Sequence, residues 1–406
     1  MTNLSTISVD QLWRTPYVKG VYSELATPDM QMSSFYRMME NRTYTPQRTF
    51  GWDLFNLTRT VATMKAPGSA PSTIQRQKIG NKTGALLRVA EKFAILDEEI
   101  AKLRPPGAPI GTMDARGEAW FTRQVKNMTQ RHKNLLEIMT SRAIQGGFGL
   151  ARSGEMYYLT ELNASGNEFD IDYFQVANDS TCRARHTGDL DGIIDVQWDD
   201  PTANIPMQLQ KLRQRMLIEY GAMSSVAWTD SITISHMMNN VHLSQIAGSA
   251  NRVWKSWDMN GSPTKVEPGD RDIGPQRIVF NAIPDWEFIV NDAVVSLGTS
   301  SDPQGTDGFT ISSAGMTRVV PAGHVLFTPP PSEDWVTCYE TDEPVQQTPN
   351  ARSEMARGFT AWNWPLNQFP PGREANMLDN FLPVIIMPRA IWNATVREPD
   401  ATFEIV

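Results

Sequence analysis

The chain has 406 residues, of which 40 % are hydrophobic and 20 % charged, and its formal net charge is −8 at pH 7. These proportions are typical of globular proteins and exclude a fibrous or disordered chain. The acidic balance excludes a protein that captures free nucleic acid through an overall basic surface.

The chain also lacks signals for export or membrane insertion. Its N-terminus shows no basic segment followed by an apolar one, and no apolar run reaches the ~20 residues that a membrane helix needs. Only two cysteines occur, Cys182 and Cys338, and they form neither a CxxC pair nor a disulfide framework. We therefore expect a cytoplasmic protein with reduced cysteines.

The first part of the chain predicts a short helix and then a long extended arm. Thr27 can cap a helix that ends near Asn41. Two strand-like runs, 48–61 and 84–96, are separated by residues 64–83, which are poor in apolar side chains and rich in Pro, Gly, Lys and Arg. We predict a two-stranded arm whose tip cannot be buried, and which needs support from another surface, such as a second subunit.

A long helix is predicted from Asp114, its cap, to Gly146. Apolar and aromatic residues recur at spacings of three and four: Phe121, Val125, Met128, His132, Leu135 and Met139. About 30 residues make a rod of roughly 45 Å. One apolar stripe is expected to face a sheet while the remaining surface is solvated, and His132 is interpreted as a packed residue rather than a base.

The middle of the chain predicts an α+β arrangement without internal repeats. A hairpin is expected over 155–176 with its turn near Gly166. A helix is expected after Asn204, with Leu209, Leu212 and Met216 on one face and its end at Gly221. A buried strand at 224–228 and a helix carrying Ile234, Met237 and Val241 form a β-α unit, and further strands are expected at 276–280, 286–290 and 324–328.

No motif for chemistry emerges, so no catalytic, cofactor or metal site is predicted. The glycines of "GGFGLARSG" (146–154) fit no phosphate-binding loop and indicate a helix end. An acidic stretch lacks the spacing of a calcium loop and is interpreted as solvated: Asp189, Asp191, Asp195, Asp199 and Asp200. His236 and His242, six residues apart on a helix, lie on nearly opposite faces and cannot share a metal.

The order of these segments, together with three quoted stretches, resembles the major capsid proteins of tailed phages with the Hong Kong 97 fold, lambda-type (capsid E) branch. The closing pattern "TAWNWPLNQFPPGREANMLDNFLPVIIMPRAIWNATV" (360–396) is the most specific, and "PAGHVLFTP" (321–329) and "FYRMMENRTYTPQRTFGWD" (35–53) are also similar to family segments. In this reading the apolar run 380–392 is a strand of the peripheral sheet, buried beneath the long helix. A core strand of an α+β enzyme would show the same local pattern.

The resemblance implies an α+β Hong Kong 97-like fold with these regions: an N-terminal arm (1–49), an extended β loop (50–112), a peripheral domain (113–203) with a spine helix (113–150), an axial domain (204–335) and a return to the peripheral domain (336–406). Residues 250–275 and 296–316 are interpreted as insertions in the axial domain. Because no large N-terminal scaffolding segment is expected, we expect the scaffold to be a separate protein.

The implied function is structural rather than enzymatic: a major capsid protein that assembles into the pentamers and hexamers of an icosahedral shell around phage dsDNA. Implied partners are other copies of the chain, a separate scaffolding protein, a portal and a decoration protein, with DNA enclosed but not bound sequence-specifically, and no membrane. The implied location is the virion, after assembly in the host cytoplasm. Candidate inter-subunit contacts are the basic residues of the extended loop: Lys65, Arg76, Lys78 and Lys82. The alternative is a hydrolytic enzyme whose site is not visible as a motif.

Overall fold

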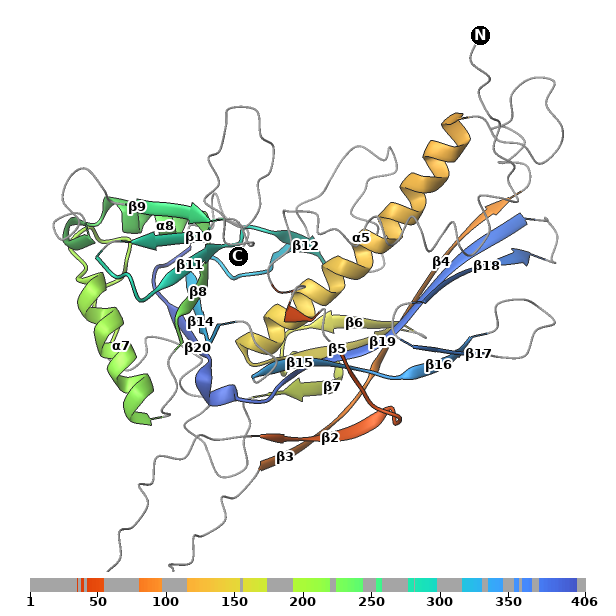
Figure 1. Ribbon diagram of the computed structural model, residues 1–406, viewed down its shortest axis with the longest axis horizontal. Helices are drawn as coiled ribbons and strands as arrows, with labels where there is room; N and C mark the ends of the chain where they lie inside the picture. The colour runs from red at the N-terminus through yellow and green to blue at the C-terminus, as the bar shows by residue number, and fades with distance from the viewer. Residues whose placement is uncertain are drawn as a thin grey trace, which may run out of the picture.

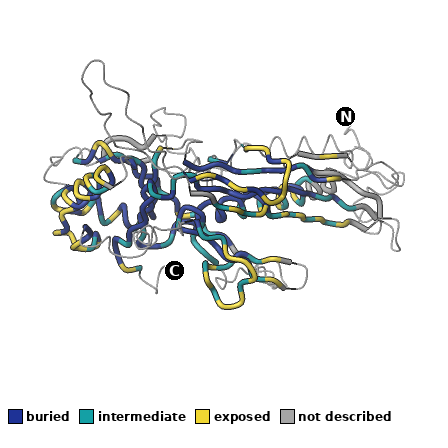
Figure 2. The backbone as a smooth tube through the Cα atoms, turned by 90° about the horizontal axis from the view of Figure 1, so that it is seen from below, coloured by how far each residue is buried: buried dark blue, intermediate teal, exposed yellow. Residues whose placement is uncertain are grey.

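The structure is a computed structural model, and it describes most of the folded elements of the chain. The described residues are 35, 38–39, 42–54, 80–96, 115–153, 156–173, 193–219, 224–243, 253–257, 277–280, 282–297, 316–330, 335–345, 354–357, 360–366 and 372–399. The molecule is elongated, with one long helix and several sheets (Figure 1). Its buried residues run through the middle of both halves (Figure 2).

Helix α5 (Ala115–Gln145) is the long helix that the periodicity predicts. It packs on β19 and β5. The prediction of a single apolar stripe is wrong for the second half of the helix, where every residue from 136 to 144 except Arg142 is buried. Polar side chains on the other faces are buried because they bond to neighbouring segments: Glu137 Oε1 accepts from the backbone N of Phe35, and Ser141 Oγ donates to the carbonyl of Val319.

The sheet beneath α5 is built around one long strand, β19 (Gly372–Ile385). Along one edge, β19 pairs with β4 (Leu87–Leu96). Along the other edge it pairs first with β18 (Thr360–Leu366) and then with β15 (Val336–Glu340), which in turn pairs in parallel with β1 (Arg42–Tyr44). Between β15 and β18 the chain forms the hairpin β16 (Asp342–Val345) and β17 (Glu354–Arg357).

The extended loop leaves this sheet through β2 (Thr49–Leu54) and returns through β3 (Gly80–Ala85), which pair antiparallel. The prediction of one long two-stranded arm is only partly correct, because 87–96 pairs with β19 and not with the outgoing strand. The change of partner falls at Leu86, whose backbone N still bonds to the carbonyl of Arg48 at 2.8 Å. Leu86 is buried at this point, and β4 then continues into the large sheet.

A three-stranded sheet follows α5, in the order β6 (Met156–Thr160), β5 (Gly147–Ser153) and β7 (Asn167–Asp172). The predicted hairpin is therefore wrong in its pairing, since β5 lies between β6 and β7. The helix end predicted at Gly146 is confirmed, and the glycine-rich stretch continues as β5. Gly147 has φ +149°, and a Cβ there would lie 2.1 Å from the carbonyl oxygen of Ile171, so only glycine fits this corner.

The second half of the molecule contains a six-stranded sheet. Its strands, in order, are β20 (Trp392–Thr395), β14 (His324–Thr328), β8 (Val226–Thr229), β11 (Glu287–Val290), β10 (Arg277–Phe280) and β9 (Val253–Trp257). Strand β9 lies within 250–275, interpreted from the sequence as an insertion. Between β11 and β14 in chain order, β12 (Val294–Ser296) and β13 (Met316–Arg318) form a separate antiparallel pair.

Strands β8, β11 and β14 of the six-stranded sheet are buried on both faces, which explains why they are almost continuously apolar. Val226 and Trp228 of β8 belong to the core that also holds the end of α5, whereas Ala227 belongs to a second core with α7 (Ile205–Glu219) and α8 (Ser231–Asn239). The helix expected after Asn204 and the β-α unit are confirmed, but α8 ends at Asn239, so Val241 lies beyond it and is exposed. The buried face of α7 carries Leu209, Leu212 and Met216 as expected.

The C-terminal apolar run is shared between the two sheets. Residues up to Ile385 belong to β19 beneath α5, as expected, but the strand does not continue to Trp392. A 3-10 turn, Pro388–Ala390, redirects the chain into β20, which pairs with β14 in the other sheet. Proline lacks the N–H that a continuing strand would need, which favours a break at this position.

Candidate functional site

Of the predicted contact residues, Lys82 lies within the described part of the chain; Lys65, Arg76 and Lys78 lie outside the described residues. Lys82 is in β3, opposite Trp52 of β2. Its ammonium group donates to the backbone carbonyl of Asp172 at the end of β7. Lys82 thus links the base of the extended loop to the three-stranded sheet of its own chain.

Aromatic side chains anchor the base of the loop. Trp52 is buried, and its ring centroid lies 6.3 Å from that of Tyr173, while Phe50 lies 4.5 Å from Tyr339 of β15. The Tyr173 hydroxyl donates to the carbonyl of Pro383 in β19, and burial raises the pKa of Tyr173. The loop therefore leaves the molecule from a packed base rather than from a hinge.

A buried charge cluster joins β1, α5 and β19. Nη1 of Arg42 lies 2.8 Å from both carboxylate oxygens of Asp379, and Nε2 of His132 lies 2.9 Å from Oδ2 of Asp379. Burial by itself would raise the pKa of Asp379, but the hydrogen bond from His132 and the charge of Arg42 outweigh it and hold that pKa below its usual value. The expectation that His132 is a packed residue is confirmed. No pattern in the sequence indicated that Asp379 would be its partner.

A second polar cluster surrounds Glu343 at the start of the β16–β17 hairpin. Oε2 of Glu343 lies 2.6 Å from Nη2 of Arg48 and 2.6 Å from Nδ2 of Asn380, and Oε1 lies 3.2 Å from Nε of Arg88. The two arginines flank the extended loop, one before β2 and one in β4. Glu343 therefore binds both ends of the loop to the sheet that carries it.

A third cluster attaches β20 to α8. Asp230 caps α8, accepting from the backbone N of Thr233 at 2.7 Å and from the backbone N of Gly323 at 2.9 Å. Nη2 of Arg397 donates to Asp230 at 3.0 Å. Burial would raise the pKa of Asp230, yet these donors and the arginine charge lower it. These donors to Asp230 all belong to the same chain, and the cluster holds the C-terminal strand β20 in position.

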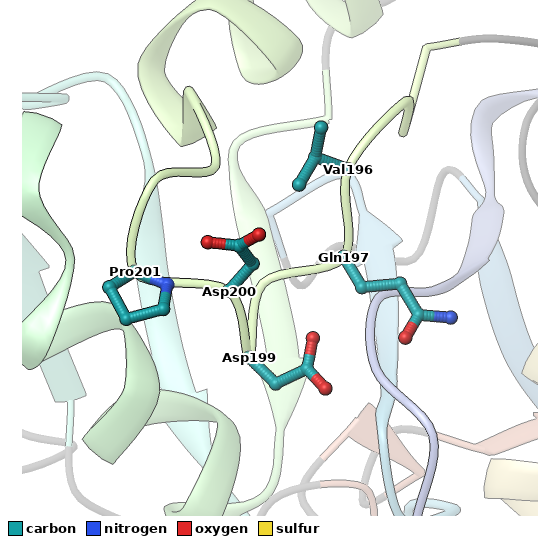
Figure 3. Close-up of a pocket in the computed structure, with 5 residues that line it drawn as sticks. All are labelled: Val196, Gln197, Asp199, Asp200 and Pro201. Carbon is teal, nitrogen blue, oxygen red and sulfur yellow. The ribbon is translucent and has the colours of Figure 1, made fainter.

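The acidic stretch lines an open depression of about 570 Å³ formed by Val196, Gln197, Asp199, Asp200 and Pro201 (Figure 3). Asp200 accepts from the backbone N of Thr202 at 2.8 Å, which lowers its pKa. Asp189 and Asp191 lie outside the described residues. No group of three or more His, Cys, Asp and Glu residues in the described ranges is placed to hold a metal ion.

Among the helices of the described ranges, none is both long and apolar enough to cross a membrane. The buried polar side chains described above bond to one another across segments far apart in the chain, such as Arg42 and Asp379, 337 residues apart. This arrangement stiffens the subunit and fixes where its loop emerges. The architecture as a whole, with a spine helix on a long sheet, an extended loop and a second sheet domain, is the α+β Hong Kong 97-type capsid fold.

Comparisons with known proteins agree with this class. Residues 28–193 match the model of the family described as phage major capsid protein E. The fold is similar to that of an Escherichia coli CFT073 prophage protein assigned as its capsid protein, with 12 % identity, a TM-score of 0.52, and coverage of 97 % of this chain and 99 % of that one. Both similarities point to a structural protein of a phage capsid shell.

Two further solved structures are similar at lower TM-scores. A phage-related protein from Bordetella bronchiseptica RB50 is 11 % identical, with a TM-score of 0.43 and coverage of 94 % of this chain and 96 % of that chain. A chain of the satellite phage P4 procapsid including size determination protein is 10 % identical, with a TM-score of 0.43 and coverage of 95 % and 91 %. A search of the curated proteins finds no match.

Proposed function

We propose that copies of this chain form the pentamers and hexamers of an icosahedral shell that encloses phage dsDNA. In this proposal the chain divides as the resemblance implies: arm 1–49, extended loop 50–112, peripheral domain 113–203 with spine helix 113–150, axial domain 204–335 and return segment 336–406. Strand β20 pairs within the six-stranded sheet, so we assign 392–395 to the axial domain instead.

The anchored loop base is the observation that carries the proposal. Trp52 is buried in the core that also contains the end of α5 and β19, and Glu343 binds arginines at both ends of the loop. Residues 55–79, by contrast, contain no acidic side chain and few large apolar ones. A stiff base under a segment that cannot form its own core suits a loop that packs on a neighbouring subunit.

The charges of the loop suggest which residues make the contact. Lys82 donates within its own chain, so we assign it an anchoring role, and we assign the inter-subunit role to Lys65, Arg76 and Lys78. We further propose a separate scaffolding protein, a portal and a decoration protein as partners, with assembly in the host cytoplasm. The net charge of −8 is compatible with a shell that encloses DNA without binding its phosphates tightly.

Negative-stain electron microscopy tests this function directly. The full chain would be expressed alone and together with its scaffolding protein, and closed shells or capsomer rings are expected in at least one preparation. A monodisperse monomer under both conditions would contradict the proposal. The variant Lys65→Ala/Arg76→Ala/Lys78→Ala tests the loop contacts: we expect fewer closed shells with an unchanged circular dichroism spectrum, and normal shells would exclude those contacts.

A further inference from the structure

The solvent-exposed face of α5 is basic, although the chain as a whole is acidic. Between Glu118 and Glu137 the helix contains no Asp or Glu, but it contains four cationic residues: Arg123, Lys126, Arg131 and Lys133. Lys133 and Glu137 are buried. The other three cations are exposed. A local positive surface on a chain whose net charge is −8 is suited to an anionic partner.

The polar side chains on this face form one continuous stripe. Side chains three or four residues apart are neighbours on the surface of a helix. Six polar residues, exposed or half-buried, follow this spacing on the side of α5 away from the sheet: Arg123, Lys126, Asn127, Gln130, Arg131 and Asn134. We call these six residues the α5 stripe. Cationic and amide side chains of this kind contact phosphate oxygens in protein–DNA complexes.

The buried face of the helix fixes the α5 stripe in place. Helix α5 packs on β19 and β5 (Figure 1). Val125, Thr129 and His132 are buried on the side of the helix opposite the stripe. Nε2 of His132 lies 2.9 Å from Oδ2 of Asp379 in β19. The backbone that carries the stripe is therefore preformed, and little backbone entropy is lost when a partner binds.

Carboxylates of the chain neutralise the α5 stripe only in part. Nε of Arg131 lies 3.0 Å from Oε1 of Glu91, but the Arg131 side chain is 73 % exposed, and ion pairs at such exposed positions are weak. Arg123 and Lys126 form no ion pair with any residue in the described part of the chain. All three cations therefore remain accessible to an external anion.

Helix α7 shows the usual arrangement on the same molecule. Two of its cations are paired with carboxylates from other segments: Nζ of Lys211 lies 3.6 Å from Oδ2 of Asp195, and Arg213 pairs with Asp285. The uncompensated charge is thus a property of the α5 stripe and not of helix surfaces throughout the molecule.

The length and charge of the α5 stripe fit weak contact with a DNA backbone. Arg123 and Arg131 are separated along the helix axis by about 12 Å. Because B-DNA carries roughly one negative charge per 1.7 Å, about seven phosphates span the same length. Three cations neutralise fewer than half of these charges. Each copy therefore binds weakly, which agrees with a shell that encloses DNA without binding its phosphates tightly.

We propose that the α5 stripe contacts the phosphate backbone of double-stranded DNA without reading its sequence, so that α5 faces the interior of the shell. This inference rests on the proposed shell function, which supplies the enclosed DNA, and it names the surface that the DNA meets. Arg123, Lys126 and Arg131 supply the charge, and the exposed amide of Asn127 adds a hydrogen-bond donor.

The salt dependence of DNA binding tests this surface without requiring shells. A labelled duplex of about 20 bp would be titrated with the unassembled full-length chain at several salt concentrations, and fluorescence anisotropy would be followed. For the wild type, we expect the logarithm of the association constant to fall with the logarithm of the salt concentration with a slope of about −3. For Arg123→Gln/Lys126→Gln, we expect a slope of about −1 and binding at low salt weakened by about tenfold or more.

The matched control removes the same charge from other surfaces. Lys92→Gln/Lys211→Gln replaces one lysine of α7 and one of β4, where Glu91 faces α5 and the adjacent Lys92 therefore points away from it. We expect this control to bind within about twofold of the wild type. Arg123→Lys should also bind within about twofold, because a phosphate contact of this kind depends on charge and not on the shape of the guanidinium.

Two further probes distinguish the partner. A duplex of unrelated sequence should bind equally, whereas labelled polyglutamate of similar charge should bind far more weakly; polyglutamate binding that matches the DNA would assign the stripe to an acidic protein and overturn the proposal. Circular dichroism establishes that each variant is folded. Absent DNA binding, or equal slopes for the wild type and Arg123→Gln/Lys126→Gln, would overturn the DNA contact even if shells form. The expected order of binding in a protein that forms no shells would support the contact and refute the shell.

Discussion

Nε2 of His132 in α5 lies 2.9 Å from Oδ2 of Asp379 in β19, where both side chains are almost completely buried. Arg42 of β1 reaches the same carboxylate from the other side, with Nη1 2.8 Å from both oxygens. One acid thus joins the spine helix, the central strand and the strand that precedes the extended loop. A buried charge held by two partners is costly to disturb, because removing it leaves Arg42 with only the longer ion pair to Glu340, at 3.7 Å.

Asp379→Asn is therefore expected to lower the free energy of unfolding by about 3 kcal/mol or more, because it leaves the Arg42 charge in a mostly buried position. Urea unfolding of the unassembled chain measures this change. The matched control is Glu374→Gln, which removes a partner of the largely exposed Lys92 at 3.4 Å and should cost less than about 1 kcal/mol. Equal losses in the two variants would contradict a special role for Asp379.

The pKa of Asp379 also predicts how this difference changes with pH. Since the pKa is lowered in the folded state, the carboxylate stabilises the fold above its unfolded pKa, about 3.9, and this contribution is lost as the pH falls through the folded pKa. The stability gap between wild type and Asp379→Asn should therefore narrow below about pH 4. A gap that stays constant down to pH 2 would be inconsistent with a lowered pKa.

His324 is expected to make stability depend on pH nearer neutrality. It is largely buried, and burial lowers its pKa in the folded chain, against the raising effects of Asn393 and Asp230. Below about pH 6.5 the unfolded state therefore binds more protons than the folded state. The stabilisation that neutral His324 gives the fold is complete above that pH and is lost as the pH falls toward the pKa of His324 in the folded state. His324→Gln, which retains a donor toward Asn393, should show a smaller fall in urea midpoint between pH 7.5 and 5.5. An identical fall would contradict this role.

Gly147 and Gly166 form a matched pair for backbone effects. Both have positive φ, +149° and +101°, but a Cβ at Gly147 would lie 2.1 Å from the Ile171 carbonyl, whereas nothing lies within 4 Å of one at Gly166. Gly166→Ala is expected to cost about 1 kcal/mol from conformation alone. Gly147→Ala should cost about 3 kcal/mol or more, because β5 and β7 must also separate. Comparable unfolding free energies in the two variants would contradict the close approach.

The Cys338 thiol is expected to resist alkylation in the folded chain. It is fully buried in β15, and burial raises its pKa to about 12. Thiolate is the reactive form, so iodoacetamide at pH 8 should modify Cys338 only when the chain opens. Mass spectrometry of a Cys182→Ser variant, with and without urea, measures this directly. Rapid native labelling would show that β15 is accessible and would contradict its place between β1 and β19.

Local structure was predictable because it depends on neighbouring residues. The period of about 3.6 in α5 and α7 predicts helices, and the short apolar runs predict β8, β10, β11 and β14. The order of these elements, with the motif 360–396, was sufficient for the resemblance to a capsid family. The sequence also contains no recognisable catalytic motif, although this absence does not by itself exclude an enzyme.

Strand partners and polar contacts depended on the tertiary structure. Residues 84–96 were equally suited to pair with 48–61, but Leu87–Leu96 pairs with Gly372–Phe381 of β19, a choice of partner that the local pattern does not encode. The same long-range packing buries α5 on several sides and places Lys82 against Asp172 instead of at a loop tip. The cluster of Arg42, His132 and Asp379 joins residues up to 337 apart. Hydrophobic periodicity encodes burial and secondary structure locally, whereas register and ion pairing are decided only when distant segments compete for the same partners in the folded chain.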